Sequence, residues 1–261
     1  MTTVLKRNKW EIWRDVIFAL FTREIKTSFN DKLGISWSVL SPIAFILVLS
    51  FIRGRVDGGD THTIPTFVFM AYGLMLVQMF LETLQSGSSA IKKNKALFAF
   101  RQVQPLSAVL AASLFGFLVK VFVLLGIYVF MYFMRIEIII DNPLLLVSLF
   151  VLLWVLAFMI GLLLGILSLY VPELSKIQSL FTRPLFFISG TFFSLQDIPQ
   201  EYWWLLDWNP ILHAIELSRF AAYTSYQDNG VSFNYFAFVV LGASFISLAI
   251  YHSQWRQAIS R

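Results

Sequence analysis

Long apolar runs, separated by short polar or basic segments, dominate the pattern of this chain. Six such runs fall at about 35–53, 66–90, 107–133, 144–170, 177–195 and 232–251. A helix needs about 20 mostly apolar residues to cross the hydrocarbon core of a bilayer, whereas the strands of a membrane barrel alternate polar and apolar positions. The pattern therefore predicts an all-α polytopic membrane protein with six transmembrane helices.

The stretch 183–220 departs from this pattern. It is apolar as far as Phe193 and then becomes acidic and Trp-rich, with prolines at 199 and 210. Irregular backbone at membrane depth needs shielding by protein or a water-filled cavity, so this stretch cannot cross lipid as one regular helix. We expect short interfacial or re-entrant helices between 196 and 231, before the last span. Such an arrangement indicates a passage for something polar.

Basic residues are distributed unevenly between the segments that join the spans. Fifteen Lys and Arg fall in 1–34, 91–106, 171–183 and 252–261, against four on the opposite side. An excess of Lys and Arg marks the cytoplasmic side of a membrane protein. Both termini are therefore predicted to be cytoplasmic, with a transmembrane domain at 35–251. The net charge of +5 reflects this topology, and no basic soluble face predicts binding to nucleic acid.

Residues 10–33 have the pattern of an amphipathic helix. Apolar residues recur at i+4 spacing: Trp13, Ile17, Phe21, Ile25, Phe29 and Leu33. Such a helix lies in the membrane plane with its aromatic side chains at the lipid headgroups. It is either a simple anchor or a cytoplasmic gate or docking element.

The segment 91–106 between the second and third spans is basic and contains no acidic residue. Its centre, 96–101, has the composition of a short helix that would expose Phe98 and Phe100. A groove on a soluble partner would bury those two rings. The segment is either a lever contacted by such a partner or a positive flank that only sets the topology.

Two ionisable residues fall inside predicted spans. At about 1.5 Å per residue, Glu82 lies about 12 Å and Lys120 about 20 Å from the cytoplasmic ends of their helices. Charges at this depth pair with each other or face a cavity, so the two form an ion pair or contribute a polar lining to a conduit. Gly161 and Gly165 form a small-xxx-small motif, which allows close helix packing within one chain or between two copies.

The sequence shows no pattern for a chemical reaction. It lacks a GxxxxGK[ST] phosphate loop, an HExxH motif and any cysteine, so no catalytic, cofactor-binding or metal-binding residue is predicted. A membrane-embedded glycan enzyme would need convergent carboxylates, and Glu82 is the one acid inside a span. A purely structural scaffold is disfavoured by the irregular segment 196–231. The chain is therefore expected to supply a path, powered from elsewhere.

These features together resemble the ABC-2-type permeases, the membrane subunits of ABC exporters. Within that family the chain is most similar to the KpsM-like permeases for capsular polysaccharide export of Gram-negative bacteria. The most specific part of the resemblance runs through Pro184, Gly190, Pro199 and Asn209-Pro210. The second is the segment NDKLGISWSVLSPI at 30–43.

The resemblance implies a type V exporter fold and a homodimer around a central canal in the inner membrane. Two copies of a separate ATPase subunit would bind ATP and Mg²⁺. The cargo would be a lipid-linked acidic polysaccharide, moved from cytoplasm to periplasm and passed to a periplasmic co-polymerase and an outer-membrane exporter. Permeases for O-antigen, teichoic acid or small molecules are the alternatives within the family.

The resemblance also suggests roles for particular residues. ATPase coupling falls to Arg23, Lys92, Lys93, Lys95, Phe98, Phe100 and Arg101. Sugars have hydroxyls that need hydrogen bonds and C–H faces that stack on rings, which gives the canal-lining candidates Trp37, Phe45, Tyr72, Phe80, Phe187, Ser189 and Phe193. The periplasmic gate would comprise Tyr202, Trp203, Trp204, Trp208, Asn209 and Pro210.

Overall fold

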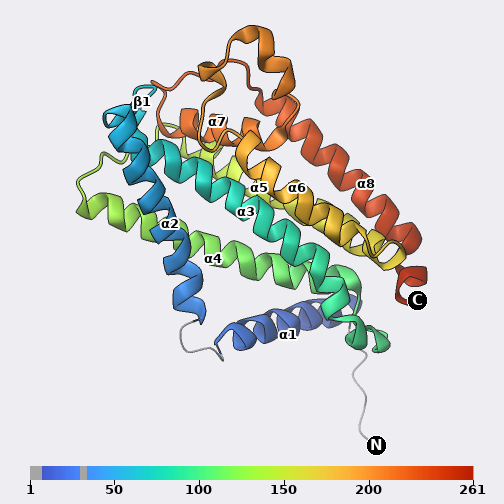
Figure 1. Ribbon diagram of the computed structural model, residues 1–261. Coiled ribbons are helices and arrows are strands. Elements are labelled where there is room, and N and C mark those ends of the chain that lie inside the picture. The colour runs from blue at the N-terminus through green and yellow to red at the C-terminus, as the bar shows by residue number, and fades with distance from the viewer. Residues whose placement is uncertain (1–7, 30–33, 261) are drawn as a thin grey trace, which may run out of the picture.

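The computed structural model describes residues 8–29 and 34–260, and within these ranges the chain is almost entirely helical. A two-residue strand pair, β1 (Asp60–Thr61) and β2 (Ile64–Pro65), joins the second helix to the third. The helices are α1 (Lys9–Phe29), α2 (Gly34–Asp57), α3 (Thr66–Lys93), η1 (Lys95–Ala99), α4 (Pro105–Phe133), α5 (Pro143–Tyr170), α6 (Leu174–Ile188), η2 (Leu195–Asp197), η3 (Gln200–Leu205), α7 (Pro210–Ala222) and α8 (Phe233–Ser260) (Figure 1).

Five of the described helices are long and apolar enough to cross a membrane: α2, α3, α4, α5 and α8. The predicted class, an all-α polytopic membrane protein, is therefore confirmed. Proline stands in the first turn of α4, α5 and α7, where its missing N–H costs no helical hydrogen bond. Asn142 and Asn209 cap α5 and α7 by accepting hydrogen bonds from Leu145 N and Ile211 N, each at 3.0 Å.

The segment expected to form a span at 177–195 differs from the prediction. Its helix, α6, has 15 residues and a length of about 22 Å, which is less than the roughly 30 Å of a hydrocarbon core. The helix ends at Ile188 because the chain turns through Gly190, whose φ of +74° is a left-handed conformation that favours glycine. Residues 189–194 then continue as irregular backbone toward η2.

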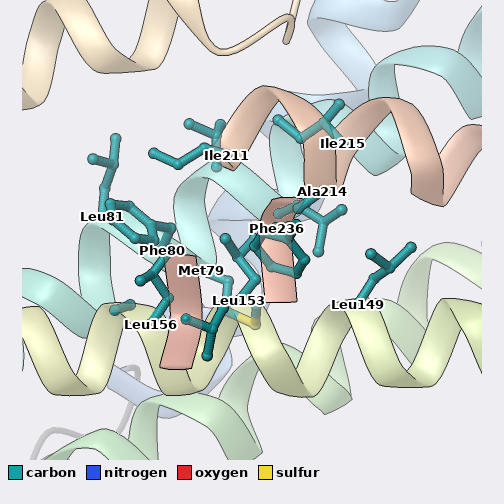
Figure 2. Packing of buried hydrophobic residues seen from close by; sticks show 14 of the residues in the cluster. Met79, Phe80, Leu81, Leu149, Leu153, Leu156, Ile211, Ala214, Ile215 and Phe236 are labelled. Carbon is teal, nitrogen blue, oxygen red and sulfur yellow. The ribbon is translucent and has the colours of Figure 1, made fainter. Parts of the chain in front are cut away.

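Helix α3 lies at the centre of the bundle, against α2, α4, α5 and α7. Figure 2 shows its residues Met79 and Phe80 beside Leu153 of α5 and Phe236 of α8, in the largest apolar cluster. By contrast, α2 leaves most of its surface uncovered by the rest of the chain. One helix is thus enclosed by its own chain, while another has a wide apolar surface available for lipid or a second copy.

The backbones of α3 and α5 come into direct contact at their glycines. A Cβ atom added at Gly161 would lie 3.3 Å from the Cα of Gly87, and one added at Gly165 would lie 3.2 Å from the carbonyl oxygen of Ser88. Small residues permit such close approach between membrane helices. The small-xxx-small motif therefore packs within one chain, which is one of the two alternatives that the sequence left open.

Helix α1 lies across one end of the bundle (Figure 1), against α4. Leu20 is buried and Val16 and Phe21 pack beside it, while Trp10 and Phe18 are exposed. The inward face is thus centred on Leu20, one position before Phe21 of the predicted stripe. The predicted position Leu33 lies outside the described residues.

Different segments lie at the two ends of the bundle. We call them the α1 end, where α1 lies, and the α7 end, where α7 lies. The α1 end holds η1 and the junction of α5 and α6. The α7 end brings together three connecting segments: Asn142 N donates to Ala221 O at 2.8 Å, and Thr63 Oγ1 donates to Ser225 O at 3.0 Å. The segment predicted to be re-entrant, 196–231, lies here as η2, η3 and α7.

The Gly87–Gly161 contact predicts a specific sensitivity. The substitution Gly161→Leu inserts a side chain between two backbones and should lower the free energy of unfolding by about 1–3 kcal/mol. The matched control is Gly242→Leu on α8, where an added Cβ meets no atom within 4 Å. Thermal unfolding of both purified variants in detergent measures the difference, and equal midpoints would contradict the packing described above.

Candidate functional site

A continuous polar surface runs along one face of α3. From Gln78 to Lys93, every α3 residue that is not buried is polar, and the buried positions between them are mostly apolar. We call this face the polar stripe; it comprises Gln78, Glu82, Gln85, Ser86, Ser88, Ser89, Lys92 and Lys93. Because these positions recur at helical spacing, they share one side of the helix over about 22 Å.

The polar stripe lies between α2 on one side and α6 on the other. A cavity of about 400 Å³ separates it from α2, α4 and the end of α1. A second cavity of about 220 Å³ separates it from α5 and α6. Amide, hydroxyl and charged side chains are costly in hydrocarbon, so this face is unsuited to lipid and suited to water or a polar cargo.

Glu82 and Lys120 form an ion pair, with 2.7 Å between Lys120 Nζ and Glu82 Oε1. This is the first of the two alternatives that the sequence left open. The pair is asymmetric, because the side chain of Lys120 is 2% exposed and that of Glu82 is 58% exposed. Both residues line the larger cavity. The stripe thus presents a carboxylate whose charge is offset from behind by a buried ammonium.

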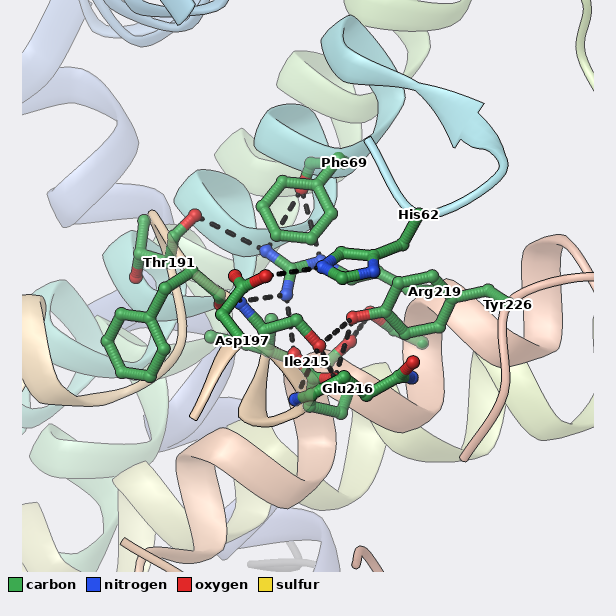
Figure 3. Close-up of polar contacts among 12 residues, drawn as sticks. His62, Phe69, Thr191, Asp197, Ile215, Glu216, Arg219 and Tyr226 are labelled. Atoms are coloured by element: carbon green, nitrogen blue, oxygen red, sulfur yellow. Dashed lines mark hydrogen bonds and ion pairs between the residues drawn. The ribbon is translucent and has the colours of Figure 1, made fainter. Parts of the chain in front are cut away.

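At the α7 end, a buried arginine binds the chain beyond α6 to α3. Arg219 of α7 is fully buried, and its guanidinium donates to the carbonyl oxygens of Phe69 (3.2 Å), Thr191 (3.3 Å) and Phe193 (3.4 Å). It also stacks on the ring of Phe69, with Cζ 3.4 Å from the ring centroid. Three carbonyl oxygens and one ring, from α3 and the segment 190–193, therefore meet at one side chain of α7 (Figure 3).

Glu216 neutralises this arginine. Its Oε1 lies 2.6 Å from Arg219 Nη1, and its Oε2 accepts from the hydroxyls of Tyr226 at 2.7 Å and Ser194 at 3.0 Å. Burial raises the pKa of the Tyr226 phenol, which keeps this donor protonated. We call Phe69, Ser194, Glu216, Arg219 and Tyr226 the Arg219 cluster. A buried charge pair of this kind is stable only when both charges and their remaining hydrogen bonds are satisfied.

Gly73 makes the close approach at this cluster possible. A Cβ atom there would lie 2.8 Å from Arg219 Nη2 and 2.9 Å from the carbonyl oxygen of Thr191. The segment 190–193 is therefore held directly against α3, one turn beyond the outer limit of the polar stripe at Gln78. Arg53 of α2 holds the same segment from another side by donating to Phe192 O at 2.5 Å.

Further polar contacts fix the remaining connections at the α7 end. His62 Nε2 lies 2.6 Å from Asp197 Oδ1, which joins the turn between β1 and β2 to η2. Two hydrogen bonds from Thr224 lower the pKa of the Asp141 carboxyl. Burial lowers the pKa of His213; its Nδ1 accepts from Ser232 N at 2.9 Å, so Nε2 carries the proton given to Asp207 O at 2.6 Å.

The canal candidates fall into two groups in the structure. Trp37, Phe45 and Phe187 are exposed on α2 and α6, and Phe193 is half-buried. Tyr72, Phe80 and Ser189 are buried inside the chain. Phe80 belongs to the apolar core, and Ser189 accepts a hydrogen bond from Asn209 Nδ2 at 3.1 Å. Tyr72 and Phe80 do not lie on an open face, because α3 turns its apolar side inward, and Ser189 is enclosed at the end of α6.

The gate candidates also divide. Tyr202, Trp204 and Trp208 are exposed, whereas Trp203 is half-buried and donates to Ile198 O at 2.8 Å. Asn209 and Pro210 begin α7, and Asn209 is buried. In this structure the last two residues set the position of α7.

The coupling candidates surround η1, the short helix expected near 96–101. Phe100 is 60% exposed, and Lys92, Lys93, Lys95 and Arg101 are exposed as well. Phe98 differs from the expectation because it is buried against α1 and α4 residues such as Leu20 and Ala108. Arg23 of α1 bonds to Asn94 Oδ1, which ties α1 directly to the start of η1.

The sequence of this chain matches a known family of membrane proteins. The sequence profile described as ABC-2 type transporter matches residues 15–223, from α1 to the end of α7. The chain belongs to the ABC-2 type transporter family. It is thus a transport permease subunit and not a catalytic enzyme.

Named relatives within the ABC-2 family differ in how similar they are to this chain. Two proteins called polysialic acid transport protein KpsM, from Escherichia coli, are each 36% identical over 253 residues, which is 96% of this chain and 97% of theirs. The O-antigen export system permease protein RfbA from Klebsiella pneumoniae is 24% identical over 210 residues, 77% of each chain.

Sequence reasoning missed two features of this ABC-2 permease. The polar stripe was readable from Gln78, Glu82, Gln85 and Ser89, which recur at helical spacing inside an apolar run. The Arg219 cluster gave a weaker signal. Glu216 and Arg219 stand three residues apart, but their segment reads as an outer connection, and nothing in the sequence indicates burial there.

The Glu82–Lys120 pair predicts an asymmetric response. Glu82→Gln leaves a buried ammonium without its counter-charge and should lower the free energy of unfolding by about 2 kcal/mol. Lys120→Met leaves a half-exposed carboxylate that water can reach, and should cost less. The double variant should recover most of the loss in thermal unfolding. Additive effects of the two changes would contradict pairing.

The Arg219 cluster predicts a larger loss. Arg219→Met leaves Glu216 buried and unpaired and should lower the free energy of unfolding by about 3–5 kcal/mol. Arg219→Lys keeps the charge but loses the planar fork of donors, so its loss should be intermediate. The control is Arg183→Met, an exposed position on α6. Thermal unfolding checks the order, and an Arg219→Met protein as stable as the control would contradict it.

Proposed function

We propose that the chain is the membrane-spanning subunit of an ABC exporter that moves a lipid-linked acidic polysaccharide of the capsular kind out of the cytoplasm. Support comes from the family, whose members are transport permeases, and from relatives named for polysialic acid transport, which are similar over nearly the whole chain. Polysialic acid is a polymer of carboxylated sugars, so it has both negative charge and many hydroxyls.

The observation that carries this proposal is the polar stripe on α3. Folding in a membrane does not require a row of amide, hydroxyl and charged groups about 22 Å long on the central helix, and such groups are costly there. A sugar polymer needs such groups, because its hydroxyls lose their water when it enters a narrow path. The stripe runs from the α1 end toward the segment 190–193.

A second copy of the chain completes the path in this proposal. Helix α2 is largely uncovered, and its exposed rings Trp37 and Phe45 lie on one side of the stripe. Phe187 of α6 is exposed on the other side and Phe193 follows it. Two stripes facing each other across a homodimer axis would form a canal with polar walls, and these rings would stack on sugar faces.

The α1 end would face the cytoplasm and a pair of ATPase subunits, which would bind ATP and Mg²⁺. Exposed Phe100 and Arg101, next to a cavity shared with Trp13 of α1, offer a ring and a cation to a partner groove. The Arg23–Asn94 bond and the buried ring of Phe98 join η1 to α1 and α4. A push on η1 would therefore move α1 and the end of α3 together.

The α7 end would face the periplasm of a Gram-negative cell, where a co-polymerase and an outer-membrane exporter would receive the polymer. The structure has a closed arrangement there, with 190–193 held by Arg219 and Arg53. The exposed rings of Tyr202, Trp204 and Trp208 would contact lipid headgroups or emerging sugar. Opening would require separating the segment 190–193 from α3.

Export of O-antigen is the second candidate, favoured by the similarity to an O-antigen permease. That similarity has lower identity and covers less of the chain than the similarity to the polysialic acid transport proteins. The basic residues near the start of the stripe, Lys92 and Lys93, suit an acidic polymer better than a neutral one.

Single cysteines test the path, since the natural sequence contains none. A water-soluble, charged maleimide should label Gln85→Cys on the stripe when added from the cytoplasmic side, and the bulky adduct should abolish export of acidic polysaccharide by cells that carry the permease and its ATPase. The control is Leu118→Cys on the lipid-facing side of α4, 40% exposed, which should react with membrane-permeant maleimide alone and keep exporting.

Two results would contradict the proposal. One is a Gln85→Cys protein that the soluble maleimide does not reach. The other is full labelling with undiminished export, which would place the cargo elsewhere.

A further inference from the structure

The smaller of the two cavities beside the polar stripe lies where the stripe begins. It is enclosed by the last turns of α3, the end of α5 and the start of α6, and measures about 220 Å³. Four serines line it, from all three helices: Ser88, Ser89, Ser168 and Ser175. We call it the serine pocket. A polymer that followed the stripe from the α1 end would meet this pocket first.

The charge of the serine pocket is positive. Lys92 and Lys93 line it, and none of the described lining residues is acidic. The larger cavity on the other side of the stripe is balanced instead, because Glu24 and Glu82 face Lys93 and Lys120 there. The serine pocket therefore favours an anion, whereas its neighbour has no net preference.

The hydrogen-bonding groups of the pocket suit a ligand rich in hydroxyls. Ser88 and Ser168 donate to carbonyl oxygens of their own helices, at 3.1 and 2.9 Å, which leaves their oxygen lone pairs free to accept from a ligand. Gln178 of α6 is buried and donates to Gln85 Oε1 at 3.1 Å. That bond leaves the amide N–H groups of Gln85 available as donors.

The rest of the pocket supplies an apolar wall. Leu164, Pro172 and Leu174 contribute aliphatic surface to its lining. A sugar ring has this combination of properties, with C–H faces for the wall and hydroxyls for the serines. The volume is below the roughly 300–1,000 Å³ of sites for drug-sized ligands, so the pocket has room for a single sugar unit and not for a longer segment.

We infer that the serine pocket binds one anionic, hydroxyl-bearing unit of the cargo as it enters the polar stripe. The anionic group is either the carboxylate of an acidic sugar or the phosphate of the lipid anchor, and Lys92 would pair with it. The inference rests on the proposed function, because it assigns the first contact of the same cargo. Lys92 then has a binding role that does not depend on the ATPase.

Direct binding tests the inference without transport. The permease–ATPase complex is placed in nanodiscs of zwitterionic lipid, and saturation-transfer NMR measures binding of glucuronate, glucose and glycerol phosphate in turn. Glucuronate or glycerol phosphate should bind and glucose should not; which anion binds identifies the source of the charge. ATP is absent throughout, so a defect in coupling cannot alter the result.

Matched variants localise the binding. Lys92→Gln should weaken binding of the anion about tenfold, as expected for loss of one charge-assisted hydrogen bond, and Ser168→Leu should fill the pocket and abolish binding. Lys176→Gln and Ser179→Leu change an exposed lysine and an exposed serine of α6 that do not line the pocket. Both should bind as the unmodified complex does.

Several outcomes would overturn the inference. These are binding of glucose as tight as that of the anions, no binding of either anion, or equal losses in Lys92→Gln and Lys176→Gln. The proposed function would survive each of them as long as the unmodified complex exports acidic polysaccharide. A complex that binds glucuronate in the pocket but exports none would instead refute the permease role and leave the pocket in place.

Discussion

The requirement that polar groups at membrane depth have partners governs the arrangement of this chain. Helix α3 meets it in three ways along its length. Its apolar positions are enclosed by α5, α7 and α8; its carbonyl at Phe69 accepts from Arg219; and its polar stripe is turned away from that core. The other helices are placed around α3 so that these three surfaces stay separate. The proposed path for the cargo and a stable core thus share one helix.

Because α3 runs from one end of the bundle to the other, it also connects the α1 end, proposed to contact the ATPase, with the α7 end. There, in the proposed function, the segment 190–193 forms the outer closure. Its last turn carries Lys92 and Lys93 and leads into η1, which Arg23 ties to α1. Its early turns carry Gly73, against which the segment 190–193 is held. In an exporter, force applied at η1 would act on the same rigid element that contacts the outer closure. No separate relay between the ends is needed.

Much of the fold was predictable because hydrophobic runs and charge bias act locally along the chain. The interface helix, the short helix near 96–101 and the irregular segment after Phe193 followed from such patterns. Where the sequence did not predict the structure, the reason was physical. Phe98 reads as an exposed ring but is covered by Leu20 of a distant helix. Arg219 reads as a loop charge, yet four acceptors from separate segments bury it. Contacts between segments far apart in sequence decide both cases.

The Arg219 cluster binds its neighbours mainly through backbone oxygen atoms, at residues 69, 191 and 193. Every residue type offers a carbonyl, so a change of side chain at 191–193 does not itself remove these acceptors of the arginine. The side chains of Thr191, Phe192 and Phe193 are therefore distinct from the hydrogen bonds by which Arg219 holds this segment. In the proposed exporter, substitutions at 191–193 would change the side chains offered to the sugar and keep the hydrogen bonds of Arg219 to the backbone.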